Sequence, residues 1–135
     1  MLIVYMSLVG NTRRFVEKLG LPSLEITDHN AFTTVDQPYL MIVPTYEIEV
    51  TDIMNDFIET GDNLSYCQGV IGGGNLNFND LFCFTAKDLA MDYDLPLLHT
   101  FEFMGNSHDV EKVKELAKEI EESTSIQRTK WNYLL

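Results

Sequence analysis

Three short segments of the sequence carry residue types that bind a phosphorylated ligand through amide and hydroxyl groups. The first segment follows an apolar run and consists of Ser7, Leu8, Val9, Gly10, Asn11 and Thr12. Backbone N–H groups at a strand-to-helix turn point into one concavity and can hold a phosphate without any cation, and alternatively Gly10 and Asn11 serve only the geometry of the turn. Ser7, Asn11 and Thr12 add side-chain donors. Because no lysine follows Gly10, the segment argues against a nucleoside triphosphate site.

The two other segments have the composition expected around a flat ligand. The middle segment consists of Pro44, Thr45, Tyr46 and Glu47, and the third segment consists of Gly73, Gly74, Asn75, Asn77, Phe78 and Asn79. Three consecutive glycines, beginning at Gly72, allow a flat group to lie against the main chain. The asparagines offer amides, and Tyr46 and Phe78 offer aromatic faces. A flat, phosphorylated ligand of this kind is flavin mononucleotide (FMN); alternatively, the glycines form a wide turn and both aromatic residues anchor their loops.

Alternating strand and helix patterns predict how the chain positions these segments. Apolar runs at 2–6, 24–26, 39–43, 68–71 and 95–103 predict strands, and 3.6-residue spacing at 12–19, 50–58, 82–93 and 110–120 predicts helices. Residues 28–38 are expected to form a loop, and Thr45 or Thr51 to cap the second helix. The alternation predicts an α/β three-layer sandwich, a five-stranded parallel sheet of order 2-1-3-4-5 with helices on both faces. The three segments then meet at one edge of the sheet.

Composition and charge narrow the class of protein. The 135 residues fit one domain, predicted at 1–121, with a tail at 122–135 that contains Trp131 and Tyr133. The net charge is −12 and no basic residue lies between Lys18 and Lys87, which argues against nucleic acid and membrane partners. The acidic segment either attracts a basic protein partner or serves solubility alone. No apolar run approaches the roughly 20 residues of a membrane span. We expect a cytoplasmic protein without a metal site, in which Cys67 and Cys83 are buried, reduced thiols.

The same segments resemble a known family. The pattern Ser7-x-Val9-Gly10-Asn11-Thr12 is similar to the flavodoxin phosphate loop, [ST]-x-T-G-x-T. Residues 73–79 and 96–110 are similar to NrdI, the flavodoxin-like partner of class Ib ribonucleotide reductase. In that family these stretches run as S-G-N-x-N-[WF]-G and P-x-x-x-K-F-E-L-x-G-T-x-x-D-V. The similarity covers about residues 1–120 and implies a flavodoxin-like fold.

The resemblance implies a role in assembling a radical cofactor. NrdI proteins bind FMN, and their reduced flavin converts O2 to superoxide, which an NrdF-type radical subunit uses to form its tyrosyl radical. An electron donor, such as a flavodoxin reductase or a thioredoxin-reductase-like protein, is the second implied partner. Because the flavin carries the chemistry, no catalytic side chain is assigned. The chain is expected to be a redox accessory flavoprotein rather than an enzyme with its own substrate.

Three departures from the family pattern affect these expectations. Val9 stands in place of a threonine, Asn79 in place of a glycine, and Glu47-Ile48-Glu49 in place of a glycine-bearing loop. Without that glycine, the middle segment should turn less readily toward flavin N5, and two nearby carboxylates should lower the reduction potential. A general electron-transfer flavodoxin is the alternative function, and a flavin-free docking module is another. A receiver-type signalling domain is disfavoured, because Pro44-Thr45 and Ser7-Leu8 replace its acidic residues.

Overall fold

The computed structural model describes residues 1–134, with the side chains of residues 1–79 and 81–123. The elements in chain order are β1 (Leu2–Tyr5), α1 (Asn11–Leu19), β2 (Ser23–Glu25), β3 (Tyr39–Val43), α2 (Ile48–Glu59), α3 (Asn63–Tyr66), β4 (Cys67–Gly74), the 3-10 helix η1 (Leu76–Leu81), α4 (Phe84–Asp92), β5 (Leu97–Glu102) and α5 (Ser107–Leu134). All strand pairs are parallel, and the sheet order is β2-β1-β3-β4-β5. The predicted architecture is therefore confirmed.

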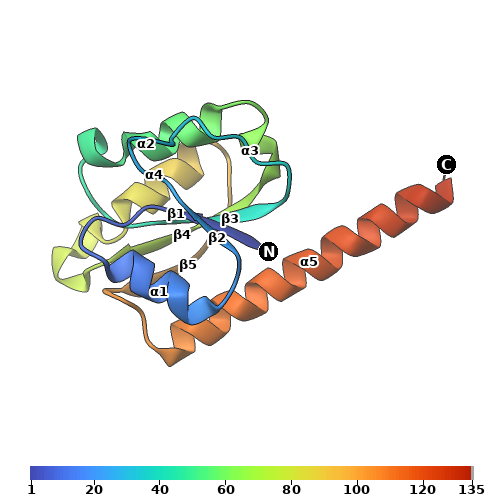
Figure 1. Ribbon diagram of the computed structural model, residues 1–135. Helices are drawn as coiled ribbons and strands as arrows, with labels where there is room; N and C mark the ends of the chain where they lie inside the picture. Colours follow the sequence, from blue (N-terminus) through green and yellow to red (C-terminus); the bar gives the residue numbers. More distant parts are fainter. Residues whose placement is uncertain (135) are drawn as a thin grey trace.

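Helices cover both faces of the sheet and bury its central strands (Figure 1). Since side chains alternate along a strand, Ile3 of β1 and Leu40 of β3 face α1 and α5, where Phe15 and Val113 complete one core. The other core lies beneath α2 and α4 and contains Val4, Met41, Phe57 and Leu89, among others. Burial on both faces explains why these strands read as continuous apolar runs.

The connection from the edge strand β2 to β3 passes β1 without a helix or strand of its own, as predicted for residues 28–38. A buried asparagine on α3 holds this segment. The Asn63 side chain accepts a hydrogen bond from Val35 N–H (2.9 Å) and donates to the carbonyls of Thr33 and Phe57 (both 2.8 Å). Sequence patterns had not identified α3, because four residues are too few to show a helical period.

The three consecutive glycines belong to the end of β4 and not to a loop, which corrects the sequence interpretation. A Cβ on Gly72 would lie 2.6 Å from Ala86 Cβ of α4, and one on Gly73 would lie 3.0 Å from the Phe101 ring of β5. On Gly74 it would lie 3.0 Å from Cys83 Sγ. Gly72 is therefore required for the close packing of β4 against α4, and Gly73 and Gly74, which line the cavity, leave little room for a side chain.

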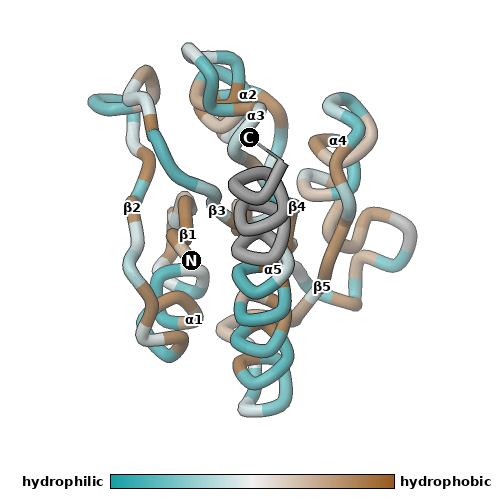
Figure 2. Tube along the Cα trace, turned by 90° about the vertical axis from the view of Figure 1, so that its right-hand side faces the viewer, coloured by the Kyte–Doolittle hydropathy of each residue, from teal (hydrophilic) through white to brown (hydrophobic). Residues whose placement is uncertain are grey.

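Helix α5 continues through residue 121 to Leu134, so the backbone does not change at the predicted start of the tail. The division into a domain and a tail stays a prediction, and the side chains of Trp131 and Tyr133 lie outside the described residues. Most of the coloured part of α5 is hydrophilic (Figure 2). Within residues 1–134, no helix combines enough length with enough apolar character to cross a membrane.

The contact between Gly72 and α4 predicts a specific loss of stability. Gly72→Ala should lower the free energy of unfolding by about 2 kcal/mol, because the added methyl group forces α4 away from β4. Urea denaturation measures this change. The double variant Gly72→Ala, Ala86→Gly moves the methyl group to the opposite side of the contact and should recover part of the loss. A single variant as stable as the wild type would contradict this account.

Candidate functional site

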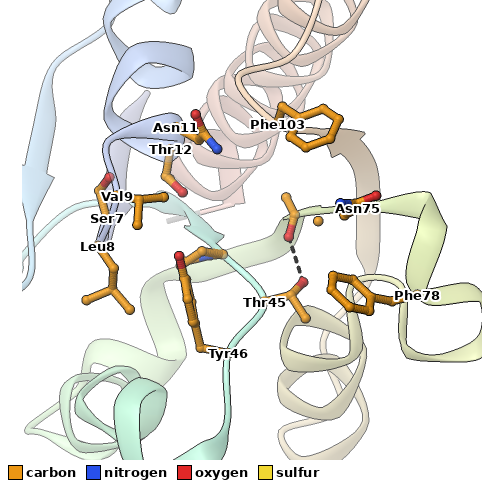
Figure 3. Close-up of a pocket in the computed structure, with 13 residues that line it drawn as sticks. Ser7, Leu8, Val9, Asn11, Thr12, Thr45, Tyr46, Asn75, Phe78 and Phe103 are labelled. Atoms are coloured by element: carbon orange, nitrogen blue, oxygen red, sulfur yellow. Dashed lines mark hydrogen bonds between the residues drawn. The ribbon is translucent and has the colours of Figure 1, made fainter.

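The carboxyl ends of β1, β3 and β4 meet around one cavity of about 340 Å³ (Figure 3). Its lining residues are Ser7, Leu8, Val9, Asn11, Thr12, Pro44, Thr45, Tyr46, Gly73, Gly74, Asn75, Phe78 and Phe103. The three segments therefore converge on one site, as the sequence predicted. Four of the predicted site residues, Gly10, Glu47, Asn77 and Asn79, do not belong to this lining.

The first segment turns the chain from β1 into α1 and brings the start of that helix to the cavity. Gly10 adopts a left-handed conformation (φ 95°, ψ −9°) that favours glycine, and it is the N-cap of α1. The Ser7 hydroxyl accepts a hydrogen bond from Arg13 N–H at 3.3 Å. The first N–H groups of a helix have no partner within the helix, and its dipole favours an anion there. Asn11 and Thr12 place this helix end at the cavity.

The positive charge nearest in sequence to this helix end is paired with a carboxylate. The Arg13 guanidinium donates to both carboxylate oxygens of Glu25, through Nε at 2.8 Å and Nη2 at 3.0 Å. These hydrogen bonds lower the pKa of the Glu25 carboxyl, and the same pair raises the pKa of Arg13. None of the described side chains that line the cavity is a lysine or an arginine. An anion in this cavity would therefore be held by neutral N–H and O–H donors.

The middle segment contributes Pro44, Thr45 and Tyr46 to the lining. The Thr45 hydroxyl donates to the Gly73 carbonyl at 2.7 Å, which joins the middle segment to the third (Figure 3). Glu47 is exposed and is the N-cap of α2, which begins at Ile48. Neither predicted cap, Thr45 or Thr51, caps this helix.

Thr51 lies within α2, and its hydroxyl donates back to the Glu47 carbonyl at 3.3 Å. Glu49 is also an exposed residue of α2 rather than of a loop. Both carboxylates therefore lie in solvent outside the cavity lining, where water screens their effect on a bound ligand. The expectation that these two carboxylates lower the reduction potential of a bound flavin therefore has little physical support.

The third segment brings one aromatic ring and one amide to the cavity. Asn75 and Phe78 line it, and the Phe78 side chain is 60% exposed. The Asn75 side-chain oxygen accepts a hydrogen bond from Asn77 N–H at 2.9 Å, so Asn75 caps η1. Asn79 has φ 49° and ψ −115°, a conformation that glycine adopts more easily. Its position in place of a family glycine therefore places strain in this turn.

Phe103 lines the cavity but was missed in the sequence. Its backbone N–H donates to the Gly74 carbonyl at 3.1 Å, directly after β5, and its side chain is 53% exposed. The sequence did contain a signal for this residue. Phe103 directly follows β5, which is parallel to β4 and therefore ends at the same edge of the sheet as the three segments. The family pattern has leucine here, so this chain has a third aromatic side chain at the cavity.

The arrangement suits a planar ligand that carries an anionic group. In Figure 3 the rings of Tyr46 and Phe78 lie on either side of Thr45. Phe103 lies across the cavity from Thr45, at the end where Asn11 and Asn75 are drawn. The first segment contributes the start of α1 together with the hydroxyls of Ser7 and Thr12, and the aromatic rings lie on the other elements that line the cavity. Donors at a helix start combined with aromatic rings match a ring system joined to a phosphate.

Comparison with known proteins identifies the family. The family model described as NrdI Flavodoxin like matches residues 3–115.

The chain belongs to the NrdI flavodoxin-like family.

Two similar relatives are each called Protein NrdI, in Streptococcus pyogenes serotype M5 (strain Manfredo) and in serotype M49 (strain NZ131). Each is 36% identical to this chain over 143 residues, an alignment that covers 100% of this chain and 88% of the relative. A solved short-chain flavodoxin associated with a bacterial microcompartment aligns with a TM-score of 0.61 and 17% identity, covering 90% of this chain and 96% of its own. That structure shows a shared fold.

Family membership confirms the resemblance drawn from the sequence motifs. NrdI flavodoxin-like proteins generally bind flavin, and the family implies association with ribonucleotide reductase. The residues of this NrdI family member that carry the family patterns include the first segment, the end of β4 and the stretch from β5 into α5. All three contribute to the cavity lining.

Both cysteines are buried free thiols, as predicted. Cys83 has a left-handed backbone (φ 55°), is the N-cap of α4, and lies behind Gly74 at the edge of the site. Burial raises the pKa of both thiols, Cys67 and Cys83, to about 11. The thiol form therefore persists at neutral pH, and neither group is an activated nucleophile.

The raised thiol pKa values predict a loss of stability in alkali. Because the ordinary thiol pKa is 9.0, the unfolded chain releases these protons before the folded chain does. The thiols' stabilising contribution is complete below about pH 9 and is lost as pH rises toward 11. The urea midpoint of the wild type should fall as the pH is raised from 8 to 11. The midpoint of a Cys67→Ala, Cys83→Ala variant should fall less steeply over the same range. Equal slopes for both proteins would contradict this assignment.

Proposed function

We infer that this NrdI family member binds FMN and supplies an oxidant to the radical subunit of a ribonucleotide reductase. The observation that carries the inference is the cavity itself, with neutral donors at the start of α1 and three aromatic rings around the remaining space. These residues fit FMN: the first segment would hold the phosphate, and Tyr46 and Phe78 would flank the ring system. The chemistry that bound, reduced FMN would supply at this site is one-electron reduction of O2 to superoxide.

The protein's own residues bind and orient the flavin in this proposal. Ser7, Thr12 and the first N–H groups of α1 would position the phosphate, while Tyr46 and Phe78 exclude water from the faces of the ring. No side chain of the lining is assigned a proton transfer. The chain then acts as a redox accessory protein, and the radical subunit carries out the radical chemistry.

Exposed apolar residues around the cavity support a protein partner. Leu8, Val9, Phe78 and Phe103 line the cavity and are each at least 48% exposed. Phe103 also lines an adjoining hollow of about 510 Å³, which extends the apolar surface to Leu76 and Met104. Contiguous exposed apolar surface of this kind marks interaction sites.

The partners fit this surface and the charge of the chain. We assign the apolar surface to an NrdF-type radical subunit, and the net charge of −12 favours basic contacts with it or with the electron donor. That donor is a flavodoxin reductase or a thioredoxin-reductase-like protein. The proposal places the protein in the cytoplasm with these partners.

Val9 provides a test of the phosphate assignment. Val9→Thr adds a hydroxyl at the cavity and should tighten FMN binding about tenfold, the value of one hydrogen bond to a charged group in a partly solvated site. Riboflavin lacks the phosphate, so its affinity should not change. Fluorescence titration of both flavins measures the effect, and Val9→Ala is the control without a hydroxyl. Equally tighter binding of riboflavin would show that the first segment does not hold the phosphate.

A reconstituted assay tests the function. The reduced, FMN-loaded protein is mixed in air with the metal-loaded radical subunit from the same cell, and tyrosyl radical is measured by electron paramagnetic resonance. Radical yield should depend on the protein, on FMN and on O2. Free reduced FMN serves as the control, and an equal yield from it would contradict delivery by the protein. Slow reaction of the reduced protein with O2 would favour a general electron-transfer flavodoxin. Failure of the protein to take up FMN would favour a flavin-free docking module.

A further inference from the structure

Thr85 in the first turn of α4 holds the backbone of the middle segment. Its side chain is buried, at 6% exposure. The Tyr46 N–H donates to Thr85 Oγ1 at 3.1 Å, and the Thr85 hydroxyl donates to the Tyr46 carbonyl at 3.0 Å. One hydroxyl therefore engages both backbone polar groups of Tyr46, a residue that lines the cavity.

The residues on either side of Tyr46 are also held. Thr45 is joined to β4 by the 2.7 Å hydrogen bond from its hydroxyl to the Gly73 carbonyl. The Glu47 carbonyl accepts from Val50 N–H at 2.9 Å and from Thr51 N–H at 3.2 Å, as the first acceptor of α2. These contacts hold both ends of the segment, and rotation of either peptide unit of Tyr46 must break its hydrogen bond to Thr85.

The side chain of Glu47 opposes the same rotation. Glu47 has φ −61° and ψ 152°, an ordinary extended conformation. Turning the peptide unit between Tyr46 and Glu47 over would carry φ of Glu47 to positive values, which a residue with a Cβ adopts rarely. The hydrogen bonds of Thr85 and the Cβ of Glu47 thus favour the same single conformation.

This constraint matters because a flavin ring changes its hydrogen-bonding character when it is reduced. The N5 atom accepts hydrogen bonds in the oxidised ring and donates one after reduction and protonation. A neighbouring backbone that can turn a carbonyl toward N5 would stabilise the protonated ring, whereas a fixed backbone would not respond.

We propose that Thr85 is a positioning residue that fixes the Tyr46 peptide units in one orientation, whether the bound FMN is oxidised or reduced. This inference rests on the proposed function for its flavin part only. The anchoring of Tyr46 by Thr85 is a property of the protein without ligand, so it can be tested separately.

Two substitutions separate the hydroxyl from the size of the side chain. Thr85→Val keeps the shape and removes the hydroxyl, and Thr85→Ser keeps the hydroxyl. In the flavin-free proteins, hydrogen exchange at the Tyr46 amide should accelerate about tenfold or more in Thr85→Val, as expected for one lost hydrogen bond, and should stay near the wild-type rate in Thr85→Ser. Wild-type exchange in Thr85→Val would overturn the anchor.

The flavin part is tested by redox titration of the FMN-loaded proteins. Once the middle segment can turn, the gap between the two one-electron reduction potentials of FMN should widen in Thr85→Val, and Thr85→Ser should keep the wild-type gap. If Thr85→Val accelerates exchange at the Tyr46 amide but leaves the gap between the two potentials unchanged, the proposal that Thr85 influences the flavin is wrong. If no protein binds FMN, the proposed function fails while the exchange result still stands.

A measurement on the wild-type protein covers the case in which Thr85→Val does not fold. Hydrogen exchange at the Tyr46 amide is compared between the oxidised and the reduced FMN-loaded protein. Equal protection in both states is expected. Loss of protection on reduction would show that the middle segment rearranges, and would overturn the proposal.

Discussion

The close contact between the glycine end of β4 and the first turn of α4 determines where much of the site lies. Gly72 allows Ala86 to approach at a distance that excludes a Cβ, and Thr85 precedes Ala86 in the same turn. That approach brings the Thr85 hydroxyl within hydrogen-bond distance of Tyr46. Cys83 occupies the space above Gly74, next to the Thr45 hydroxyl. A larger residue at the end of β4 would therefore displace both the helix and the anchor of the middle segment.

The electrostatics of the site differ from those of the whole protein. The chain carries a net charge of −12, yet one end of its cavity is built from the start of a helix, which favours an anion. Arg13 adds little long-range attraction, because Glu25 neutralises it through two hydrogen bonds. Attraction for a phosphate is then short-ranged and depends on hydrogen-bond geometry. Such a site favours a ligand that places an anionic group at the donors and a ring against the aromatic residues.

The sequence predicted the sheet order and the convergence of the three segments, because strand and helix periods are properties of local sequence. It failed where contacts between distant elements decide. The roles of Gly72 and Thr85 depend on the separation of β4 and α4, and Phe103 reaches the cavity only because β5 pairs with β4. Glu47 was predicted to lie near the ligand, but it is the N-cap of α2, and its side chain lies in solvent. The helix itself begins at Ile48, two residues before the predicted start. Helix boundaries of this kind depend on tertiary packing as well as on capping residues.

The anchored backbone and the exposed apolar side chains at the cavity have a joint consequence for association. Covering an exposed residue costs conformational entropy, and the cost is smaller when its backbone is already fixed. Tyr46 is held by Thr85, and Phe103 is held by the Gly74 carbonyl. Phe78 follows the Asn75 cap of η1, and its N–H donates to the Asn75 carbonyl at 3.1 Å. A partner surface that covers these rings would therefore bury apolar area without first ordering the segments that carry them, and it would exclude water from the cavity in the same step.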